Sequence, residues 1–519
     1  MFKGFEAPVP LLPEILDLHG RWRGERDALV CDDVRLNWRQ FCAANHQLAH
    51  ALLAQNIGRG ARVGVVMSNS PEMAQALFGI MAAGAVSVPV NLSVSDEAMA
   101  AMLCDADISA LIVSVDQQAR LQALAKQLPD NLLRISCGPP AAGWQQLAAL
   151  CDGQSTSLPS INIEDRDELN IIYSSGTTGL PKGIVHTHAG RRDWAYDLTI
   201  ALRYHGAART LLTIGLYSNI SWVAMLSTVL GGGTLVIHRS FDADAFLDTV
   251  AAEHITHTAM VPIQFQRVAE AAGRRAIDVG SMEAMMSCGS PLHESLKQDI
   301  FRLFPCGIIE LYGLTEGIIT TLDPEDAAGR WASVGKPLLG TDICIVGDDG
   351  AVLPAGQAGE IVSRGRITMP GYLNRPEASA EAEYIDAAGR QWIRSGDIGL
   401  LDNEGFLYIV DRKKDMILSG GQNIYPQDIE AVLVQHPAVD DVAVIGAASS
   451  RWGETPVALI VQVAGCVETV DDILIWANER LGRQQRLADA IAVEVLPRNP
   501  NGKLLKRELR QQFGELSYG

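Results

Sequence analysis

The stretch YSSGTTGLPKG, residues 173–183, decides the fold and points to the chemistry. It follows the apolar residues 169–172 and brings four hydroxyl residues, three glycines and Lys182 into eleven positions. Glycines let backbone N–H groups approach a ligand closely, and hydroxyls and a lysine supply further donors for anionic oxygens. The stretch therefore predicts a phosphate-binding loop at the end of a strand.

Two other interpretations of this stretch fit less well. The Walker A pattern G-x-x-x-x-G-K-[ST] cannot be laid over residues 176–183 without breaking its spacing and losing the final hydroxyl. A flexible Ser/Gly linker seldom carries Pro-Lys-Gly and then continues into apolar sequence. Nucleotide chemistry remains the preferred interpretation.

The composition limits the classes of partner. The chain has 519 residues, of which 48% are hydrophobic and 20% charged, and its formal net charge is −19. This length predicts a large body and at least one smaller domain. The negative charge argues against binding to a nucleic-acid backbone or to anionic lipid, so small molecules or proteins are the expected partners.

The cysteines and the apolar runs suggest a compartment. Nine cysteines are scattered without any C-x-x-C pair, which favours reduced thiols over disulfides or structural zinc. The first twenty residues contain acids and prolines where a signal peptide needs an apolar core. No apolar run reaches the roughly 18 residues of a membrane span. We expect a cytoplasmic protein without a membrane span.

The order of predicted elements defines an α/β fold. Residues 62–67, 85–90 and 110–113 are typical of strands, and residues 70–83 and 96–105 between them have helix-start signals and helical spacing. A loose segment, 138–164, follows, and the pattern restarts near residue 210. Alternating strands and helices predict parallel sheets, here in two packed βα-layered subdomains of one large N-terminal body.

The C-terminal part has a different texture. Short strands and turns from residue 346 predict a small β-rich part of the body. Beyond residue 411, predicted helices at 426–436 and 470–481 and strands at 442–445 and 457–463 predict a small, mobile α+β domain. We place the boundary at the charged run DRKKD, residues 411–415, which gives domains 1–411 and 412–519.

Several further stretches have compositions suited to a nucleotide. SCGSP at 287–291 predicts a tight turn, YGLTE at 312–316 joins an aromatic ring to a hydroxyl and a carboxylate, and SGD at 395–397 closes a strand with an acid. An aromatic ring can stack on a base, oxygen ligands suit Mg²⁺, and a carboxylate suits ribose hydroxyls. Each stretch alone is better explained as a structural turn, and only their order favours the nucleotide interpretation.

Taken together, these motifs resemble those of the adenylate-forming superfamily of acyl-CoA synthetases, nonribosomal adenylation domains and beetle luciferases. The resemblance covers essentially the whole chain, through YSSGTTGLPKG, YGLTE, SGD and DRKKD and through SGGQNIYP (419–426) and PNGK (500–503), in the family's order. It implies a carboxylate–CoA ligase of the AMP-forming acid–thiol class, which uses ATP, Mg²⁺ and coenzyme A. It leaves a homodimer open.

The resemblance also implies roles for individual residues. The groups that would surround the β- and γ-phosphates and the departing pyrophosphate are Ser174, Ser175, Gly176, Thr177, Thr178, Gly179 and Lys182. The adenine would lie between Gly289, Ser290, Pro291, Tyr312 and Gly313, the ribose would contact Asp397 and Arg412, and Thr315 and Glu316 would hold phosphate oxygen and Mg²⁺, with Glu316 as the metal ligand.

The resemblance implies a two-step reaction with a moving small domain. Lys503 would bridge the acyl carboxylate and the α-phosphate during adenylate formation, helped by Lys182, Thr315 and Glu316. Because Lys503 would obstruct the incoming thiol, the small domain would then turn about Lys414 and present Gly420 and Gly421 to pantetheine. In this scheme Lys182 assists, and the decisive charge belongs to Lys503.

The acyl pocket is predicted from a comparison with the family pattern. The chain has GLYS at 215–218 where the family often carries a Pro-x-aromatic-His stretch, and it has Gly313 where acetate-activating relatives carry a tryptophan. A pocket larger than acetate needs is therefore expected. Its predicted lining, without an Arg or Lys to suggest a second substrate carboxylate, is Leu216, Tyr217, Ser218, Ile220, Trp222, Val223, Gly313, Leu314, Ile318 and Ile319.

This lining favours an aromatic or arylalkanoic acid, as in aromatic acid degradation. A medium-chain fatty acid, and a free-standing adenylation enzyme that loads a carrier protein, are the alternatives. A luciferase-like oxygenase is less favoured, and a non-catalytic protein would be expected to lose Lys503, Glu316 or Lys182. His186 and His188 lack the spacing of a metal site, so we expect surface or hydrogen-bonding roles for them.

Overall fold

The computed structural model describes residues 9–129, 131–174, 181–275, 277–419, 422–483, 485–498, 502, 504–514 and 516–518. The chain forms two compact units that alternate along the sequence. The first unit comprises Met1–Trp331, Pro337–Asp342 and Arg364–Glu383, and the second comprises Ala332–Lys336, Ile343–Ser363 and Tyr384–Gly519. The β-rich part that we expected in the N-terminal body thus groups with the C-terminal part, and the boundary at 411/412 stays a prediction.

One sheet of the first unit has the order β7-β6-β5-β3-β4-β8-β9, and its strands are parallel except for the antiparallel pair β8–β9. The strands are β3 (Arg62–Val66), β4 (Val86–Pro89), β5 (Ala110–Val113), β6 (Leu133–Ser136), β7 (Gln145–Gln146), β8 (Glu168–Tyr173) and β9 (Gly183–Thr187). The helices nearest in sequence are α1 (Leu12–Trp22), α2 (Trp38–Ala54), α3 (Pro71–Ala82), α4 (Asp96–Asp105), α5 (Val115–Ala123) and α6 (Leu147–Cys151), with the 3₁₀ turn η1 (Ala125–Gln127).

A second sheet of the first unit runs in the order β15-β14-β13-β12-β10-β11-β1-β2, with parallel strands between β14 and β1. The strands are β1 (Asp27–Cys31), β2 (Val34–Asn37), β10 (Arg209–Leu212), β11 (Thr234–Ile237), β12 (His257–Met260), β13 (Ala284–Ser287), β14 (Ile309–Leu314) and β15 (Ile318–Leu322). The remaining helical elements of this unit are α7 (His188–Ala201), α8 (Asn219–Gly231), α9 (Ala243–Ala252), α10 (Pro262–Arg274), α11 (Glu294–Leu303), α12 (Pro376–Glu381) and η2 (Pro324–Asp326).

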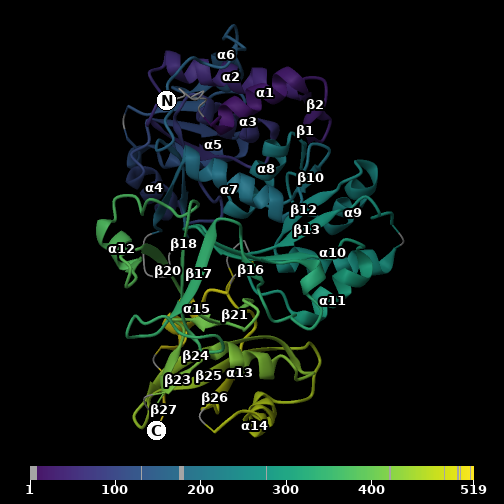
Figure 1. Cartoon of the computed structure of the whole chain (residues 1–519), viewed down its shortest axis with the longest axis vertical. Helices are drawn as coiled ribbons and strands as arrows, with labels where there is room; N and C mark the ends of the chain where they lie inside the picture. Colours follow the sequence, from purple (N-terminus) through teal and green to yellow (C-terminus); the bar gives the residue numbers. More distant parts are fainter. Residues whose placement is uncertain are drawn as a thin grey trace, which may run out of the picture. The chain divides into compact units, whose positions relative to one another are not determined.

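Both sheets share one hydrophobic core. Val63 and Val65 of β3, Leu212 of β10 and Leu235 of β11 belong to the same buried cluster as residues of α2, α3 and α8. Helix α8 is apolar nearly all round and packs on both α7 and β10 (Figure 1). A helix buried on all sides is typical of a layer between two sheets. The expected α/β body of two packed βα-layered subdomains is confirmed.

The second unit holds the shorter sheets. Strands β20 (Gln391–Leu401) and β21 (Leu407–Arg412) form an antiparallel pair, next to β17 (Thr341–Val346), β18 (Gly359–Gly365) and β19 (Glu383–Ile385) in the same sheet. In the short strand β16 (Lys336–Pro337), the first residue belongs to the second unit and the second residue to the first unit.

The C-terminal sheet is built around the long antiparallel pair β24–β25. Its strands are β22 (Ile417–Ser419), β23 (Gln422–Ile424), β24 (Val439–Ser449), β25 (Gly453–Gln462), β26 (Asp489–Ala492) and β27 (Ser517–Tyr518), and its helices are α13 (Pro426–Leu433), α14 (Val470–Arg480) and α15 (Lys506–Phe513). Helices α13 and α14 cover one buried cluster, and α15 contributes to another. This is the predicted small α+β domain.

One expectation from the sequence is qualified by the structure, and another agrees with it. Segment 138–164, predicted as a loose connection, contains β7 and the short helix α6. All nine cysteines are free thiols. None of the helices in the described part of the chain combines the length and the apolar character that a bilayer crossing requires.

Candidate active site

The predicted phosphate loop joins β8 to β9 as a hairpin connection. At its neck the backbone N–H of Ser174 donates to the carbonyl oxygen of Lys182 at 3.0 Å, and Tyr173 pairs with Gly183 across the strands. Ser175, Gly176, Thr177, Thr178 and Gly179 lie outside the described residues. Ser174 and Lys182 therefore hold the two ends of the loop together, and the loop's contacts with phosphate remain a prediction.

The YGLTE motif forms a second hairpin, between β14 and β15. Tyr312 pairs with Thr320 and Gly313 with Ile319, and Thr315 and Glu316 occupy the turn. Gly317 closes this turn at φ +111, a conformation that side-chain-bearing residues rarely adopt, and a Cβ there would lie 2.5 Å from the carbonyl oxygen of Ile367. The glycine thus fixes the backbone that presents Thr315 and Glu316.

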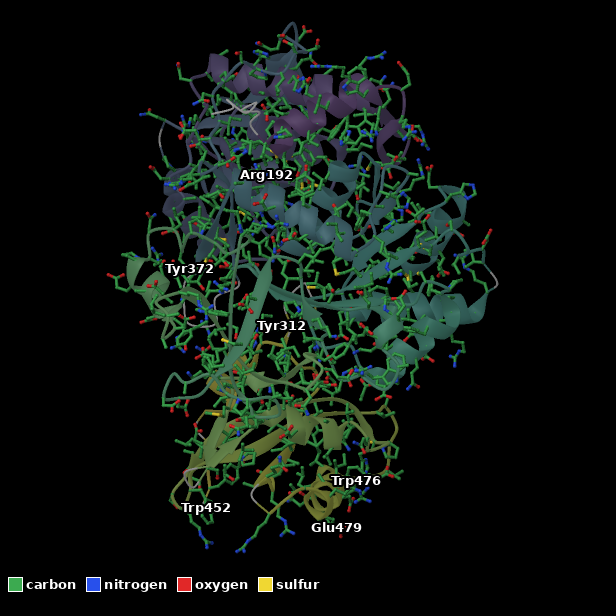
Figure 2. All side chains as sticks on the ribbon, viewed as in Figure 1. Arg192, Tyr312, Tyr372, Trp452, Trp476 and Glu479 are labelled. Atoms are coloured by element: carbon green, nitrogen blue, oxygen red, sulfur yellow. The ribbon has the colours of Figure 1, made fainter. Side chains whose placement is uncertain are left out.

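Tyr372 connects these two hairpins. Figure 2 labels this tyrosine. Its hydroxyl donates to Glu316 Oε1 at 2.9 Å, and the Lys182 ammonium lies 4.8 Å from the centre of its ring. Burial raises the pKa of Tyr372, and the charge of Glu316 and its hydrogen bond raise it further, so this hydroxyl stays a proton donor. The structure thereby brings Lys182 and Glu316 to one place in the first unit.

Tyr372 is not among the site residues predicted from the sequence. The residue follows Met369-Pro370-Gly371 in a segment without regular periodicity, and its backbone forms a bridge to Ile184 of β9. A Pro-Gly pair directly before an aromatic ring was the only available signal, and such pairs usually mark turns. The link to Glu316 arises from tertiary contacts that the sequence pattern does not display.

The predicted adenine turn and Tyr312 follow neighbouring strands. Gly289, Ser290 and Pro291 come directly after β13, and Gly289 has φ +100. Tyr312 lies near the end of β14, which pairs in parallel with β13 through Met286 and Ile309. Carboxyl ends of neighbouring parallel strands meet at one edge of a sheet, where ligands of α/β proteins bind. This placement is consistent with the predicted bracket around a base.

Residues before and within α8 would form the acyl side. Ser218 caps α8 by accepting from the Ile220 N–H, and Trp222, fully buried, donates from Nε1 to the Leu216 carbonyl at 3.0 Å. The ring of Tyr217 lies where a side chain at Gly215 would be, so that glycine is required for the fold of this turn. Leu314 and the buried Ile318 flank the β14–β15 turn.

The structure gives a second reason for a glycine at position 313, besides the wide acyl pocket predicted from the sequence. A Cβ at this position would lie 2.7 Å from the backbone carbonyl oxygen of Ile318, closer than real Cβ contacts. The close approach of β15 therefore requires glycine whatever the acid. The wide pocket that we inferred from Gly313 stays a prediction.

In the second unit, the predicted ribose ligands lie side by side. Asp397 of β20 and Arg412 of β21 are paired in register, with Arg412 Nε 3.6 Å from Asp397 Oδ1. The Asp397 side chain is buried, whereas that of Arg412 is partly exposed. The pairing holds the carboxylate and the guanidinium on one face of the β20–β21 ribbon, as a shared ribose site needs.

The predicted hinge region follows directly after β21. Asp411 accepts from the N–H groups of Arg412 at 2.6 Å and of Gln427 at 3.1 Å, the latter in the first turn of α13. Burial raises the pKa of Asp411 to about 6, although Lys506 lowers it. Lys414 is exposed in the turn that follows, and Asp415 pairs with Arg510 of α15 at 2.6 Å. The role of Lys414 as the hinge stays a prediction.

The remaining predicted residues of this unit are Gly420, Gly421 and Lys503, and they lie outside the described residues. Gly502, the neighbour of Lys503, has φ +78, and its carbonyl oxygen accepts from Arg498 at 2.9 Å. Arg498 in turn pairs with Asp441 of β24. The chain just before Lys503 is therefore anchored to the C-terminal sheet.

The prediction for the two histidines was partly wrong. His186 and His188 are buried, and within the described ranges of the chain neither His188 nitrogen nor His186 Nε2 has a hydrogen-bond partner. Burial lowers the pKa of His188 to about 4. The described residues contain no group of His, Cys, Asp or Glu side chains that could hold a metal by themselves. Mg²⁺ commonly uses one or two carboxylates with phosphates and water, and Glu316 fits that need.

Two family descriptions match the chain. The description "AMP-binding enzyme" matches residues 18–373, and "AMP-binding enzyme C-terminal domain" matches residues 428–503. The first match alone covers more than half of the chain and ends just after Tyr372. The second includes strands β24, β25 and β26 of the C-terminal sheet and ends at Lys503.

Curated relatives match over nearly their full length. A long-chain-fatty-acid–CoA ligase, FadD13, of Mycobacterium tuberculosis is 33% identical over 492 residues, covering 93% of this chain and 94% of the relative. A feruloyl-CoA synthase of Amycolatopsis is 33% identical over 474 residues, covering 90% and 92%. An indoleacetate–CoA ligase of Aromatoleum aromaticum is 32% identical over 509 residues, covering 96% and 98%.

Solved structures share the fold. The o-succinylbenzoate CoA synthetase of Bacillus subtilis, in complex with its acyl-adenylate intermediate, has a TM-score of 0.84 at 27% identity and covers 97% of this chain and 99% of its own. A fatty acyl CoA synthetase of Mycobacterium tuberculosis has a TM-score of 0.78 at 30% identity, covering 98% and 99%. The predicted class, an AMP-forming acid–thiol ligase using ATP, Mg²⁺ and coenzyme A, is confirmed, and the chain belongs to the AMP-binding enzyme family.

Proposed function

We propose that this protein joins an aromatic or arylalkanoic acid to coenzyme A in two steps, through an acyl-adenylate. The observation that carries the proposal is the contact of Tyr372 with both Glu316 and Lys182. It places a carboxylate suited to Mg²⁺ and a cation suited to phosphate beside the neck of a glycine-rich loop. This is the set of charges that splitting ATP requires.

In the first step, a carboxylate oxygen of the acid attacks the α-phosphorus, and the bond to pyrophosphate breaks. Two anions must approach each other, so the protein contributes mainly positive charge and in-line positioning. Lys182 would stabilise the departing pyrophosphate, and Lys503 would neutralise the acyl carboxylate and the α-phosphate. Mg²⁺, when bound, would polarise phosphate oxygens near Glu316 and Thr315.

In the second step, the thiol sulfur of coenzyme A attacks the acyl carbonyl, and AMP leaves with the electrons of the acyl–phosphate bond. A lysine between the carboxylate and the phosphate would now obstruct the thiol. We therefore assign Lys414 as the hinge and Gly420 and Gly421 as the segment beside the pantetheine arm. Exposure of Lys414 in a turn is compatible with a change of its backbone angles.

We prefer an aromatic acid as the substrate because the predicted acyl side contains aromatic side chains. Tyr217 and Trp222 stand at the start of α8, and aromatic side chains favour offset or edge contacts with another ring. Feruloyl-CoA synthase and indoleacetate–CoA ligase are among the relatives, which supports an aromatic acid in a degradative pathway. FadD13, named for long-chain fatty acids, keeps a fatty acid as the second candidate.

Pyrophosphate release measured with benzoate, cinnamate, a 2-arylpropionate, octanoate and palmitate tests the choice of acid. We expect the highest kcat/KM with one of the three aryl acids. Activity confined to octanoate and palmitate would overturn the aromatic assignment and leave the ligase reaction intact. Release of pyrophosphate from none of the five would count against both.

The thiol acceptor needs a separate measurement. A CoA ligase shows saturable, CoA-dependent thioester formation, with AMP produced in equal amount. An adenylation enzyme that serves a carrier protein would release pyrophosphate with the same acids but form no thioester at saturating CoA. That outcome would move the assignment to a free-standing adenylation enzyme.

We further propose a cytoplasmic location, supported by nine free thiols, and leave a homodimer as a hypothesis. Sedimentation at micromolar concentration would decide between monomer and dimer.

A further inference from the structure

Arg191 of α7 is a buried cation, only 1% exposed. Its Nε donates to Asn170 Oδ1 at 3.0 Å, and its Nη2 donates to Asn219 Oδ1 at 2.8 Å. The guanidinium carbon lies 4.5 Å from the ring centre of Trp194 and 5.3 Å from that of Trp222. In the described part of the chain, no carboxylate forms an ion pair with it. Its partners are two neutral amides and two indole faces.

Arg192, the next residue, provides a direct contrast. It is nearly as buried, but it pairs with Asp193 at 2.9 Å and with Asp165 at 3.3 Å (Figure 2). Lys297 of α11 is likewise buried and pairs with Glu310. Burying a cation without a counter-charge is costly, and proteins usually pair such groups. Arg191 departs from this rule within the same helix and the same unit.

Burial lowers the pKa of Arg191 to about 9, so the guanidinium still carries its charge at neutral pH. The cost of burial is therefore not relieved by loss of the proton. Cation–π contacts with two tryptophans offset part of it. A group held charged, desolvated and without an anion is well prepared to bind one.

Two residues near Arg191 carry further hydrogen-bond donors. Among the residues that the structure describes, no hydrogen-bond partner reaches the buried Asn170 Nδ2 or His186 Nε2, and the two residues are paired in register between β8 and β9. Asn170 uses its oxygen for Arg191, which leaves its two N–H donors free. A neutral imidazole can present a further N–H at Nε2. The cluster of Asn170, His186 and Arg191 is thus rich in donors and short of acceptors.

This donor cluster adjoins the first turn of α8. Asn219 is the first residue of α8, and Trp222 lies one turn further on. Both contact Arg191. Asn219 follows directly on Tyr217 and Ser218, which we assigned to the acyl side. The predicted pocket lining contains no Arg or Lys because Arg191 belongs to α7, a helix that the sequence patterns did not indicate.

We propose that Arg191 is a specificity-determining residue that selects acids with an oxygen acceptor at the end remote from the activated carboxylate. The inference rests on the proposed function and names a subclass of its aromatic acids. A distal carboxylate or ketone would accept from Arg191 and from the free donors of Asn170 and His186. A hydrocarbon group of the same size would leave these donors desolvated and unpaired.

Matched acids test this proposal on the wild-type enzyme. The probes are 3-phenylpropanoic and benzoic acids that carry a para carboxylate, acetyl or isopropyl group, where acetyl and isopropyl have nearly the same shape. We expect kcat/KM for pyrophosphate release to be about 10- to 100-fold higher with the carboxylate or acetyl acid than with the isopropyl acid. Equal or better use of the isopropyl acid would overturn the role of Arg191 and leave the ligase assignment standing.

Variants identify the residue responsible. Arg191→Met should reduce the acetyl-to-isopropyl preference to nearly one, whereas Arg192→Met, which disrupts the paired neighbour, should keep it. The KM for ATP should stay unchanged in both. If Arg191→Met does not fold, Arg191→Lys, which keeps the charge, replaces it. Arg191→Lys should keep part of the preference for the carboxylate acid. A full preference in Arg191→Met would refute the proposal, and pyrophosphate release with no acid in any form would count against the proposed function too.

Discussion

The two parts of the candidate site are held in different ways. In the first unit, Lys182, Tyr372 and Glu316 come from three distant segments and contact one another through side chains. In the second unit, Asp397 and Arg412 pair across one β-ribbon, and Asp411 accepts from nearby backbone N–H groups. The first part therefore depends on tertiary packing and the second on local structure. Changes in the first should alter chemistry, and changes in the second should also alter stability.

The largest effect is expected at Lys503, which would act in adenylate formation but not in thioester formation. Lys503→Ala should lower the rate of adenylate formation by about 10³-fold, because it removes the charge that neutralises the reacting anions. The same variant should form thioester from a synthetic acyl-adenylate at nearly the wild-type rate. Pyrophosphate release and thioester formation, measured separately, would show this division.

Lys182→Ala is the matched control in the first unit. Since Lys182 only assists the departing pyrophosphate, adenylate formation should fall by about 10-fold. A larger loss for Lys182→Ala than for Lys503→Ala would reverse the proposed ranking of the two lysines. Equal loss of both half-reactions in Lys503→Ala would remove the division of labour.

Glu316→Gln should lower the rate of adenylate formation by about 100-fold, because an amide is a weaker Mg²⁺ ligand than a carboxylate. Titration with Mg²⁺ should show a weaker apparent affinity, while melting temperature changes little. Glu325→Gln, which alters an exposed ion pair with Arg203, is the control and should be active. An unchanged Mg²⁺ dependence in Glu316→Gln would exclude it as a metal ligand.

Asp411 should make the stability of the second unit depend on pH. Burial raises its pKa from 3.8 to about 6, so the folded chain holds a proton that the unfolded chain has lost between about pH 4 and pH 6. The contribution of Asp411 to stability is therefore greatest below pH 4 and falls by on the order of 2–3 kcal/mol as pH rises to 6.

Denaturant unfolding of the wild type and of Asp411→Asn across this range measures the effect. The difference between the two should grow in favour of the variant from pH 4 to pH 6 and stay level above. The exposed Asp440 of β24, changed to Asn, serves as control and should show no such trend. A constant difference between wild type and Asp411→Asn would contradict the raised pKa.

A modest effect, no larger than that of Lys182→Ala, is expected from Tyr372→Phe at the link between the hairpins. Tyr372→Phe keeps the ring beneath Lys182 and removes only the hydrogen bond to Glu316. Adenylate formation should therefore fall by about 10-fold, and the apparent affinity for Mg²⁺ should be weaker. Tyr372→Leu also removes the ring and should cost more. If both variants behave alike, the contact between Lys182 and the ring has no part in catalysis.

Local patterns in the sequence predicted much of the fold. The β-branched runs that became β3, β4 and β5, and the capped helices α3 and α4, depend on nearest neighbours and were recognised within a few residues. The order of motifs identified the family. Contacts between distant segments were missed: Tyr372 against Glu316, and Arg191 against Trp222. Burial of a charge cannot be seen in a sequence, since arginine is normally exposed.

The sequence does not display the contacts by which the β-rich part groups with the C-terminal unit. A charged run such as residues 411–415 is a local signal, whereas the extent of a compact unit depends on which strands pair. Strand β21 pairs with β20 and also precedes α13 closely enough for Asp411 to contact Gln427.

Gly313 sets a limit on how this enzyme could be re-engineered. The family resemblance implies a tryptophan at this place in acetate-activating relatives, but here any side chain would meet the Ile318 carbonyl oxygen at 2.7 Å. A designer who wants a short-acid enzyme must therefore move the backbone of the β14–β15 hairpin in the same step. Natural selection faces the same obstacle, since a first mutation at 313 would harm the hairpin before any gain in selectivity. The backbone of one turn thus narrows the range of acids that descendants of this chain can reach by single substitutions.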